Sequence, residues 1–192
     1  MIAIVKYNAG NITSVKNAVE RLGYSCIVTD DEHLLKTAEK VIFPGVGEAS
    51  SAMKYLKKKG LDEVIKNLTQ PVLGICLGQQ LMCNFSEEGN TKCLGIFDAN
   101  VKKFEPKLKV PHMGWNTITD LKSKLYNEIS SEQDFYFVHS FYSEICSETT
   151  AVCDYIVPFS ASMQKNNFYA TQFHPEKSSS IGEKLLSNFL KL

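Results

Sequence analysis

The sequence predicts an α/β fold: a mostly parallel open sheet flanked by helices, with added antiparallel strands in the C-terminal half. In the first half, short apolar runs alternate with segments of helical periodicity, which is the order expected of parallel strands joined by helices. In the second half, strand-like segments follow one another with few helices between them. The 192 residues can bury a sizeable core, and no linker divides them. We therefore expect a single domain over residues 1–192.

The first half is expected to contain four strands, each followed by helix. The expected strands are the apolar runs 2–7, 24–29, 41–43 and 72–75, the third of which is cut by Pro44. The expected helices are 12–22, 30–39, 48–59 and 61–68, and one after the last strand that carries Leu81, Met82 and Phe85 on one face. Asparagine and glycine at 8–11 predict a turn, and Gly23 stands where a C-terminal helix cap is expected.

The second half is expected to add strands at one edge of the sheet. The expected strands are 94–97, 100–104, 135–142, 151–157 and 168–173. Asn166 and Asn167 predict a hairpin turn before the last of them. The serines at 178–180 predict the N-terminal cap of a closing helix over 181–190.

Composition limits the partners and the compartment. Lys+Arg and Asp+Glu are both 21, so the net charge gives no reason to expect a nucleic-acid or membrane partner. The six cysteines show no C-x-x-C pair and no metal-finger spacing. The opening apolar run is too short for a secretory signal or a membrane span. We therefore expect reduced thiols in a cytoplasmic protein, with no metal and no cofactor.

The stretch Gly74-Ile75-Cys76-Leu77-Gly78 fits the nucleophile-elbow pattern, in which glycines flank a reactive side chain. A strained turn from strand to helix pushes the central side chain into the open. The helix that begins there offers free N–H groups and a positive dipole end, which both favour the thiolate of Cys76. On its own, such a cysteine is more often a small buried hydrophobe, so catalysis requires a base and an oxyanion site elsewhere in the chain.

A candidate base stands near the C-terminus. In an extended chain residues i and i+2 point the same way, so His174 and Glu176 are expected on one face, with Pro175 restricting the backbone between them. A carboxylate beside an imidazole fixes its tautomer and raises its basicity, so the histidine can take a proton from a thiol. A lone His-x-Glu is usually a surface pair. Together with the elbow it predicts a Cys–His–Glu triad.

A candidate oxyanion site follows the third expected strand. Glycine-rich turns at strand ends present N–H groups to anions, where open α/β sheets bind their ligands. The turn Pro44-Gly45-Val46-Gly47 fits this description. In the hydrolase pattern, the oxyanion is held by the N–H after the nucleophile and by one N–H of another loop, roles that Leu77 and Val46 fit. Without the other two features, we would interpret this segment as an ordinary connection between a strand and a helix.

These residues resemble a known family. The segments Gly-Ile-Cys-Leu-Gly-Gln-Gln at 74–80 and Gln-Phe-His-Pro-Glu-Lys-Ser at 172–178 are similar to the class I (triad) glutamine amidotransferases, whose fold is flavodoxin-like. Further segments resemble the glutaminase subunits of imidazole glycerol phosphate synthases, of histidine biosynthesis: 8–15, 43–47, 86–89, 111–116, 137–140 and 170–172. The resemblance covers nearly the whole chain, and Pro-His-Met-Gly-Trp-Asn at 111–116 is specific to this subgroup. Gln79 departs from the methionine usual in the family.

The resemblance implies a mechanism and a set of site residues. Cys76 attacks the carboxamide of L-glutamine, His174 passes the thiol proton to the leaving ammonia, and Glu176 orients His174. The N–H groups of Leu77 and Val46 hold the oxyanion. The implied substrate-binding residues are Gly45, Gly47, Gln80, Glu88, Ser140 and Phe141. Among them, Glu88 is expected to pair with the substrate ammonium and Gln80 to bond its carboxylate; without the family, both would read as solvated polar groups at helix ends.

The resemblance also implies a partner. In the family it is a synthase (cyclase) subunit of (β/α)8-barrel fold, which forms a heterodimer with the glutaminase and makes imidazole glycerol phosphate and AICAR. No P-loop stands in the sequence, so the phosphorylated acceptor is expected on the partner. The implied partner contacts are Asn11, Trp115 and Lys177. Tryptophan alone would suggest core, whereas in this motif it is interpreted as an interface anchor.

Three alternatives stay open. One is a paralogous subunit that feeds a different synthase, for example in surface-sugar amidination. Another is a non-catalytic binding subunit, whose signature would be a missing triad member. The third is a stress-type elbow-cysteine protein or a peptidase, which would lack the His-Pro-Glu end and the segment 111–116. His112 and His139 are interpreted as buried structural histidines rather than catalytic ones, and His33, among acidic residues, as solvated.

Overall fold

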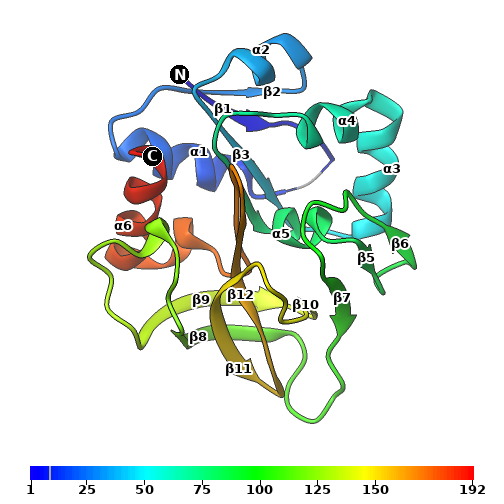
Figure 1. Ribbon diagram of the computed structural model, residues 1–192, viewed down its shortest axis with the longest axis vertical. Coiled ribbons are helices and arrows are strands. Elements are labelled where there is room, and N and C mark those ends of the chain that lie inside the picture. The colour runs from blue at the N-terminus through cyan, green and yellow to red at the C-terminus, as the bar shows by residue number, and fades with distance from the viewer. Residues whose placement is uncertain (9) are drawn as a thin grey trace.

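The computed structural model describes residues 1–8 and 10–192 and places the parallel strands of the first half in one large sheet (Figure 1). The elements up to the elbow are β1 (Ile2–Val5), α1 (Ile12–Arg21), β2 (Cys26–Thr29), α2 (Glu32–Thr37), β3 (Lys40–Gly45), α3 (Ala49–Lys59), α4 (Leu61–Lys66), β4 (Val72–Cys76) and α5 (Leu77–Met82). Strands β2, β1, β3 and β4 are neighbours in that order, and each pair is parallel.

The second half extends the same sheet with antiparallel strands and adds a smaller one. Its elements are β5 (Phe85–Ser86), β6 (Thr91–Lys92), β7 (Asn100–Lys103), β8 (His112–Thr119), the 3₁₀ turn η1 (Lys124–Tyr126), β9 (Gln133–His139), β10 (Phe141–Ser143), β11 (Thr149–Tyr155), β12 (Val157–Lys165), β13 (Phe168–Thr171), the 3₁₀ turn η2 (Pro175–Lys177) and α6 (Ser179–Leu190). Strand β13 joins β4 in parallel, and β12, β11, β8 and β9 follow it antiparallel. The predicted fold class is confirmed.

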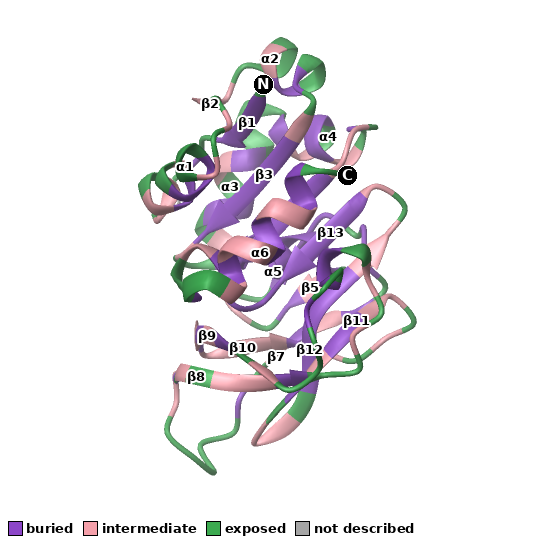
Figure 2. Cartoon of the chain, turned by 90° about the vertical axis from the view of Figure 1, so that its left-hand side faces the viewer, coloured by how far each residue is buried: buried purple, intermediate pink, exposed green. Residues whose placement is uncertain are grey.

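Helices cover both faces of the parallel part, as Figure 1 shows. The core on one face is formed by the sheet with α3, α4 and α5, and it includes Met53, Leu56 and Leu81. The core on the other face is formed with α1 and α6, and it includes Val19 and Phe189. Figure 2 shows the same division as buried strands between helices with exposed outer surfaces.

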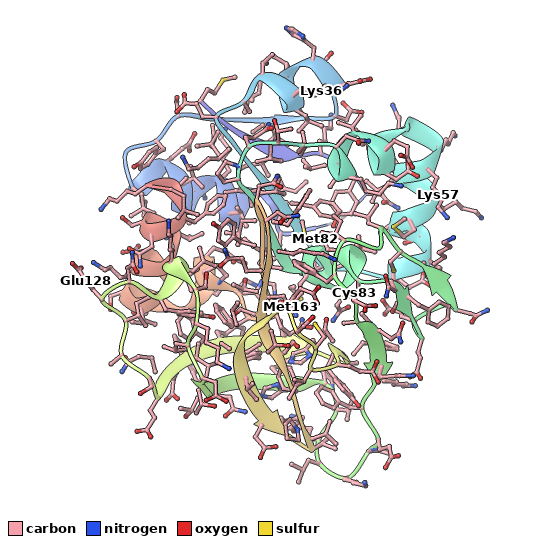
Figure 3. The ribbon with its side chains drawn as sticks, viewed as in Figure 1. Lys36, Lys57, Met82, Cys83, Glu128 and Met163 are labelled. Atoms are coloured by element: carbon pink, nitrogen blue, oxygen red, sulfur yellow. The ribbon has the colours of Figure 1, made fainter. Side chains whose placement is uncertain are left out.

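The side chains follow this layering (Figure 3). Met82 at the end of α5 and Met163 on β12 lie in the interior, and both are fully buried. Lys36, Lys57 and Glu128 project from the periphery, where water can hydrate their charges. Within residues 1–8 and 10–192, no helix has the length and apolar character needed to cross a membrane.

Helix boundaries follow the expected local signals. Helix α1 ends before Gly23, whose φ of 85° is the left-handed conformation that glycine adopts after a helix end. Asp31 caps α2 by accepting a hydrogen bond from the Leu34 N–H at 2.9 Å. The expected turn at 8–11 includes Ala9, which lies outside the described residues.

Four expectations for the strands and the elbow helix were wrong in detail. Strand β3 continues through Pro44 to Gly45. A proline is tolerated there because, among the described residues, β1 pairs with β3 only as far as Ile42 and the ladder beyond it is with β4 alone. The expected strand 94–97 is a loop, since its N–H groups bond to carbonyls at the C-terminal end of α5 instead of a strand. The expected strand 135–142 breaks at Ser140 into β9 and β10, which belong to different sheets. Phe85 lies in β5 and not on the elbow helix, which ends at Met82.

Four strands were not expected at all: the short β5 and β6 of the smaller sheet, and β8 and β12 of the large one. Strand β8 carries the segment 112–119, whose exposed Met113 and Trp115 obscure the alternation of a half-buried strand. Strand β12 contains Pro158 and runs into the predicted Asn166–Asn167 hairpin turn, which the structure confirms. Strands β8 and β12 belong to the antiparallel half of the large sheet.

Candidate active site

The elbow has the strained geometry that its pattern predicts. Strand β4 ends at Cys76, α5 begins at Leu77, and Cys76 has φ 53° and ψ −107°. A positive φ is unfavourable for a non-glycine residue, so the packing around the turn must impose it. A Cβ on Gly78 would lie 1.9 Å from the Phe43 carbonyl oxygen, and one on Gly74 would lie 2.9 Å from the Met82 Sδ. The flanking glycines therefore allow α5 to pack directly against the sheet.

The thiol of Cys76 is mostly covered. The residue is 6% exposed, and Gln172 Nε2 donates a hydrogen bond to its Sγ at 3.6 Å. The Sγ also lies 3.9 Å from the carbonyl oxygen of Val138 on β9. Gln172 follows β13, the neighbour of β4, so the sheet topology brings these groups to the nucleophile.

The candidate base and carboxylate form a buried pair. His174 Nδ1 lies 2.8 Å from Glu176 Oε1, and both side chains are inaccessible to solvent. Pro175 begins the turn η2, so the backbone is not extended as expected; a tight 3₁₀ turn brings the two side chains together instead. Asn11 Nδ2 also donates to the same carboxylate oxygen. Among the described residues, His174 Nε2 has no hydrogen-bond partner, which leaves that nitrogen for the thiol.

Electrostatics couple this histidine to the cysteine. Burial lowers the pKa of His174, but the negative charges of Cys76 and Glu176 raise it more, and the net pKa lies well above the usual value. A raised pKa favours the imidazolium form of His174. Burial, with a smaller effect of the Cys76 charge, also raises the pKa of the Tyr7 phenol, which therefore stays neutral.

A pocket of about 260 Å³ opens in front of Cys76. Its lining residues come from the turn between β3 and α3, the elbow with α5, the loop between β5 and β6, the segment before β8, and the junction of β9 with β10: Val46, Gly47, Cys76, Leu77, Gln80, Glu88, Pro111, Val138, His139, Ser140 and Phe141. The volume suits a ligand of amino-acid size, and polar groups stand at several points of its wall. The structure thus brings together the predicted nucleophile, both oxyanion candidates and most of the predicted substrate-binding residues.

Two polar side chains of the pocket already have internal partners. Glu88 Oε2 accepts a hydrogen bond from the Ala49 N–H in the first turn of α3, at 2.8 Å. Burial raises the pKa of Glu88, an effect that the Ala49 N–H reduces and Glu48 increases. Gln80 Nε2 donates to the Phe141 carbonyl and to Gln172 Oε1, each at 2.9 Å. Both amide hydrogens of Gln80 are therefore in use, and its oxygen is the group left to face a ligand.

The turn after β3 is held at several points. Tyr7 donates its hydroxyl to the Pro44 carbonyl at 2.7 Å, and the Gly10 N–H donates to the Val46 carbonyl at 3.3 Å. A Cβ on Gly45 would lie 2.0 Å from the Tyr7 hydroxyl, and Gly47 has φ 130°, so both positions require glycine. Gly45 pairs with Cys76 and is buried beside the pocket without lining it.

Residues 3–192 match the family described as glutamine amidotransferase class-I. Two similar relatives are named imidazole glycerol phosphate synthase subunit HisH. The one from Bacteroides fragilis is 59% identical, and the one from Bacteroides thetaiotaomicron is 60% identical; each match covers 100% of this chain and 99% of the relative. The chain belongs to the HisH family of class I glutamine amidotransferases. The predicted resemblance is confirmed.

Solved structures support the fold independently of this identity. A structure described as a glutamine amidotransferase has a TM-score of 0.75 at 17% identity and covers 100% of this chain and 98% of its own. The structure of PurLQS from Thermotoga maritima has a TM-score of 0.72 at 16% identity, with 99% and 97% covered. These matches extend over the added antiparallel strands as well as the parallel sheet. The class I amidotransferase fold is therefore present in full.

The three residues predicted to contact a partner lie in different surroundings. Trp115 on β8 is 53% exposed beside Met113, which is 57% exposed, so Trp115 is not a core residue. Lys177 is exposed at the end of η2. Asn11 is half-buried and donates a hydrogen bond to Glu176, so its side chain contacts the candidate site itself.

Two residues near the thiol were not among the predicted site residues. Gln172 stood within the recognised motif, but nothing in the sequence shows that its amide reaches Cys76, since this contact depends on the pairing of β13 with β4. His139 was interpreted as structural, and it is indeed buried, yet it also lines the pocket. Across residues 1–8 and 10–192, His, Cys, Asp and Glu side chains form no group of three that could hold a metal ion.

Because two histidines of this amidotransferase are buried, we expect its free energy of unfolding to depend on pH. Burial lowers the pKa of His112 to about 4; burial, with smaller effects of His112 and His174, lowers that of His139 to about 3, although the Phe141 carbonyl opposes this. In the unfolded chain, histidines have a pKa near 6.5. The contribution of the neutral buried histidines to the free energy of unfolding is therefore fully present above that pH and falls as the pH drops toward 4. We expect His112 to contribute a loss of roughly 1–2 kcal/mol between pH 7.5 and 5.

Urea denaturation of the wild type and of His112→Phe at both pH values tests this, because phenylalanine keeps the ring but removes the titration. The variant should lose less stability than the wild type between the two values. An identical loss in both proteins would show that His112 does not titrate with a lowered pKa.

Proposed function

We propose that this chain is the glutaminase subunit of an imidazole glycerol phosphate synthase, which hydrolyses L-glutamine and supplies ammonia to a cyclase subunit in histidine biosynthesis. The observation that carries the proposal is the buried His174–Glu176 pair beside the elbow cysteine, which lies in the wall of an amino-acid-sized pocket. The charge of Cys76 raises the pKa of His174, and His174 Nε2 has no hydrogen-bond partner among the described residues. All three triad residues are present, which disfavours a non-catalytic binding subunit. The names of the two Bacteroides relatives support the pathway.

The chemistry assigns one role to each triad residue. The Sγ of Cys76 attacks the carboxamide carbon of glutamine, and a C–S bond forms as the carbonyl oxygen becomes an oxyanion. His174, protonated at Nε2, gives its proton to the amide nitrogen as the C–N bond breaks and ammonia leaves. Water then attacks the thioester with His174 as base, which releases glutamate and restores the cysteine. Glu176 holds the Nδ1–H of His174, so that Nε2 faces the reaction throughout.

The oxyanion is held by backbone donors. The Leu77 N–H is the first of α5 and has no partner within that helix, so it is available beside the thiol. We assign the second donor to Val46, whose turn lines the same pocket. One such donor contributes roughly 3 kcal/mol to transition-state stabilisation. Gly45 and Gly47 flank Val46 and allow backbone conformations that are closed to other residues, so a partner that loosens the contacts of this turn can set the direction of the Val46 N–H.

The substrate's amino-acid end lies at the other end of the pocket. Glu88 supplies a carboxylate for the ammonium group, and its existing bond to the Ala49 N–H fixes its position. Gln80 presents its amide oxygen, because its N–H groups are engaged; this makes it an acceptor for a substrate N–H rather than a donor to the carboxylate. Backbone groups of Ser140 and Phe141, where β9 passes into β10, complete the site.

The ammonia acceptor belongs to the partner, a cyclase subunit of HisF type with a (β/α)8-barrel fold, in a heterodimer. Met113 and Trp115 are two positions apart on β8, so they share one face of the strand, where they form an exposed apolar patch. Trp115 packs edge-on against Tyr136 of β9, with ring centroids 6.0 Å apart, so the patch has a rigid base. Lys177 is proposed to contact the partner as well. We place the complex in the cytoplasm, where the six cysteines stay reduced.

Trp115→Ala is expected to weaken association with the cyclase subunit while the isolated chain stays folded. A buried aromatic anchor at an interface commonly contributes roughly 2 kcal/mol or more, which corresponds to an increase of about thirtyfold in Kd. Titration calorimetry with the purified cyclase subunit measures the effect. Ile145→Ala is the matched control, since Ile145 is 51% exposed but belongs to the loop between β10 and β11 and not to β8. Equal affinities of the Trp115 and Ile145 variants would place the interface elsewhere.

Glutamate release tests the proposed function. We expect slow release by the chain alone and a marked increase when the cyclase subunit and its ligand are added. The paralogue alternative predicts stimulation only by a different synthase, such as one of surface-sugar amidination. No glutamate release with any partner would contradict the glutaminase assignment itself.

A further inference from the structure

Two buried histidines contact each other beside the pocket, and one of them, His139, lines it. His112 begins β8 and His139 ends β9, and the two residues are paired across the antiparallel ladder. His112 Nδ1 lies 3.0 Å from His139 Nε2, and His139 Nδ1 lies 2.7 Å from the Phe141 carbonyl oxygen. On the far side, Asn116 Nδ2 lies 3.2 Å from His112 Nε2. The glutaminase mechanism uses none of these side chains.

The surroundings keep both imidazoles neutral. His112 stacks between the rings of Phe137 and Tyr155, with centroid distances of 4.9 Å and 4.0 Å. His139 is packed among aromatic rings that include Phe104 and Phe159. Among residues 1–8 and 10–192, no carboxylate contributes to the pKa of either histidine, and burial lowers the pKa of both groups far below 7. The hydrogen bonds must therefore be made by neutral rings, each with one N–H and one bare nitrogen.

The partners then determine the tautomers. A carbonyl oxygen only accepts, so the proton of His139 is on Nδ1 and its Nε2 is bare. The bare Nε2 needs a donor, so the proton of His112 is on Nδ1 as well. The bare Nε2 of His112 accepts from Asn116, whose amide oxygen accepts from the Thr117 N–H at 2.8 Å. In every hydrogen bond of the series from Asn116 to the Phe141 carbonyl, the donor is therefore the member on the Asn116 side.

This series of hydrogen bonds ends on the Phe141 carbonyl, a group that also supports a residue of the pocket. The Phe141 carbonyl accepts from His139 and also from Gln80 Nε2. Gln80 donates its other amide hydrogen to Gln172, which in turn donates to the Cys76 thiol. The Phe141 carbonyl is thus held by two hydrogen bonds. It fixes both the backbone at 140–141 and the side-chain amide of Gln80.

We propose that His112 and His139 form a neutral positioning relay that holds the Phe141 carbonyl, and through it the glutamine-binding backbone and Gln80, in the geometry required for substrate binding. The inference rests on the proposed glutaminase function and adds two positioning residues to it. The relay also begins on β8, whose other face carries the exposed Met113 and Trp115. A partner bound to that face would contact the strand from which the relay starts.

The tautomers can be observed directly. Long-range ¹H–¹⁵N spectra of the chain labelled at its histidine rings distinguish Nδ1–H from Nε2–H and from the imidazolium. We expect both His112 and His139 to be neutral Nδ1–H tautomers with no titration between pH 5.5 and 8. An Nε2–H tautomer at His139, or titration of either ring in this range, would overturn the relay whatever the catalytic activity.

Kinetics of the complex test the consequence for binding. His112→Phe keeps the stacked ring but leaves His139 Nε2 without its donor, so we expect the KM for glutamine to rise roughly five- to tenfold, the effect of about one hydrogen bond, with kcat changed less than twofold. His112→Asn places an amide N–H near the former Nδ1 and should restore most of the affinity. Tyr155→Phe is the matched control, because it keeps the ring stacked on His112 and removes only the bond from the Tyr155 hydroxyl to the Lys109 carbonyl.

The outcomes separate the relay from mere packing. An unchanged KM in His112→Phe would reduce the pair to a packing element, as would equal KM increases in His112→Phe and Tyr155→Phe. If the wild-type complex released no glutamate, the glutaminase function would fail, and the histidine spectra would still decide whether the relay exists.

Discussion

Cys76→Ala is expected to abolish glutamine-dependent synthesis by the complex and to preserve synthesis from added ammonia. The thiol is the only group at the elbow that can form the thioester, and it lies in the wall of the pocket against Gln172 and Val138. Loss of a catalytic nucleophile can lower turnover on the order of a millionfold. The added-ammonia reaction bypasses this step, because only the release of ammonia from glutamine needs Cys76.

The measurement compares glutamate release and product formation with glutamine or ammonium as the nitrogen source. Cys83→Ala is a suitable control, since Cys83 is a fully buried thiol at the end of the same helix. Burial raises the pKa of Cys83 to about 12, so it stays a thiol and does not act as a nucleophile. Glutamate release that persisted in Cys76→Ala would remove Cys76 from the mechanism.

Glu176→Gln is expected to give the second largest effect, a fall in glutamine turnover of roughly a thousandfold or more. The amide and the carboxylate are nearly equal in volume, so the fold should survive the change. The amide can donate to His174 Nδ1, which would move the ring proton to Nε2 and leave no basic nitrogen toward the thiol. The lost negative charge would also lower the pKa of His174, because Glu176 is one of the groups that raise it.

Glu183→Gln makes the same substitution at an exposed site on α6, where Glu183 pairs with Arg21. Melting temperatures and glutamate release of both variants separate a catalytic effect from a general one. If the turnover of Glu176→Gln matched that of Glu183→Gln, Glu176 would be a bystander.

The parallel half of the fold was predictable because its signals are local. Apolar runs, helical periodicity and the glycine after α1 specify each strand–helix unit within a few residues, and Gly74 of the elbow is required by contacts with the helix that directly follows it. The antiparallel half was less predictable because its strands depend on partners far away in the sequence. Strand β8 exposes Met113 and Trp115, which look like core residues until the sheet shows them facing outward.

The residues of the proposed triad could be found for a similar reason, since a nucleophile elbow and a His-x-Glu pair are short patterns, although the backbone between His174 and Glu176 forms a 3₁₀ turn and not the extended chain that was expected. The groups that hold the triad in place could not be found in this way. Asn11 reaches Glu176 from 165 positions away, and Gln172 reaches Cys76 from 96 positions away. Such contacts are set by the order of strands, which no short pattern in this sequence contains.

The central claim is that the elbow of this chain supplies the nitrogen that its partner incorporates. Amide-¹⁵N glutamine, given to the reconstituted complex in excess unlabelled ammonium, tests it directly by mass spectrometry of the imidazole product. The account predicts a ¹⁵N fraction in the product well above that of the bulk ammonium, and none in the Cys76→Ala complex. Product carrying no more ¹⁵N than the bulk ammonium, although the chain releases glutamate, would contradict it.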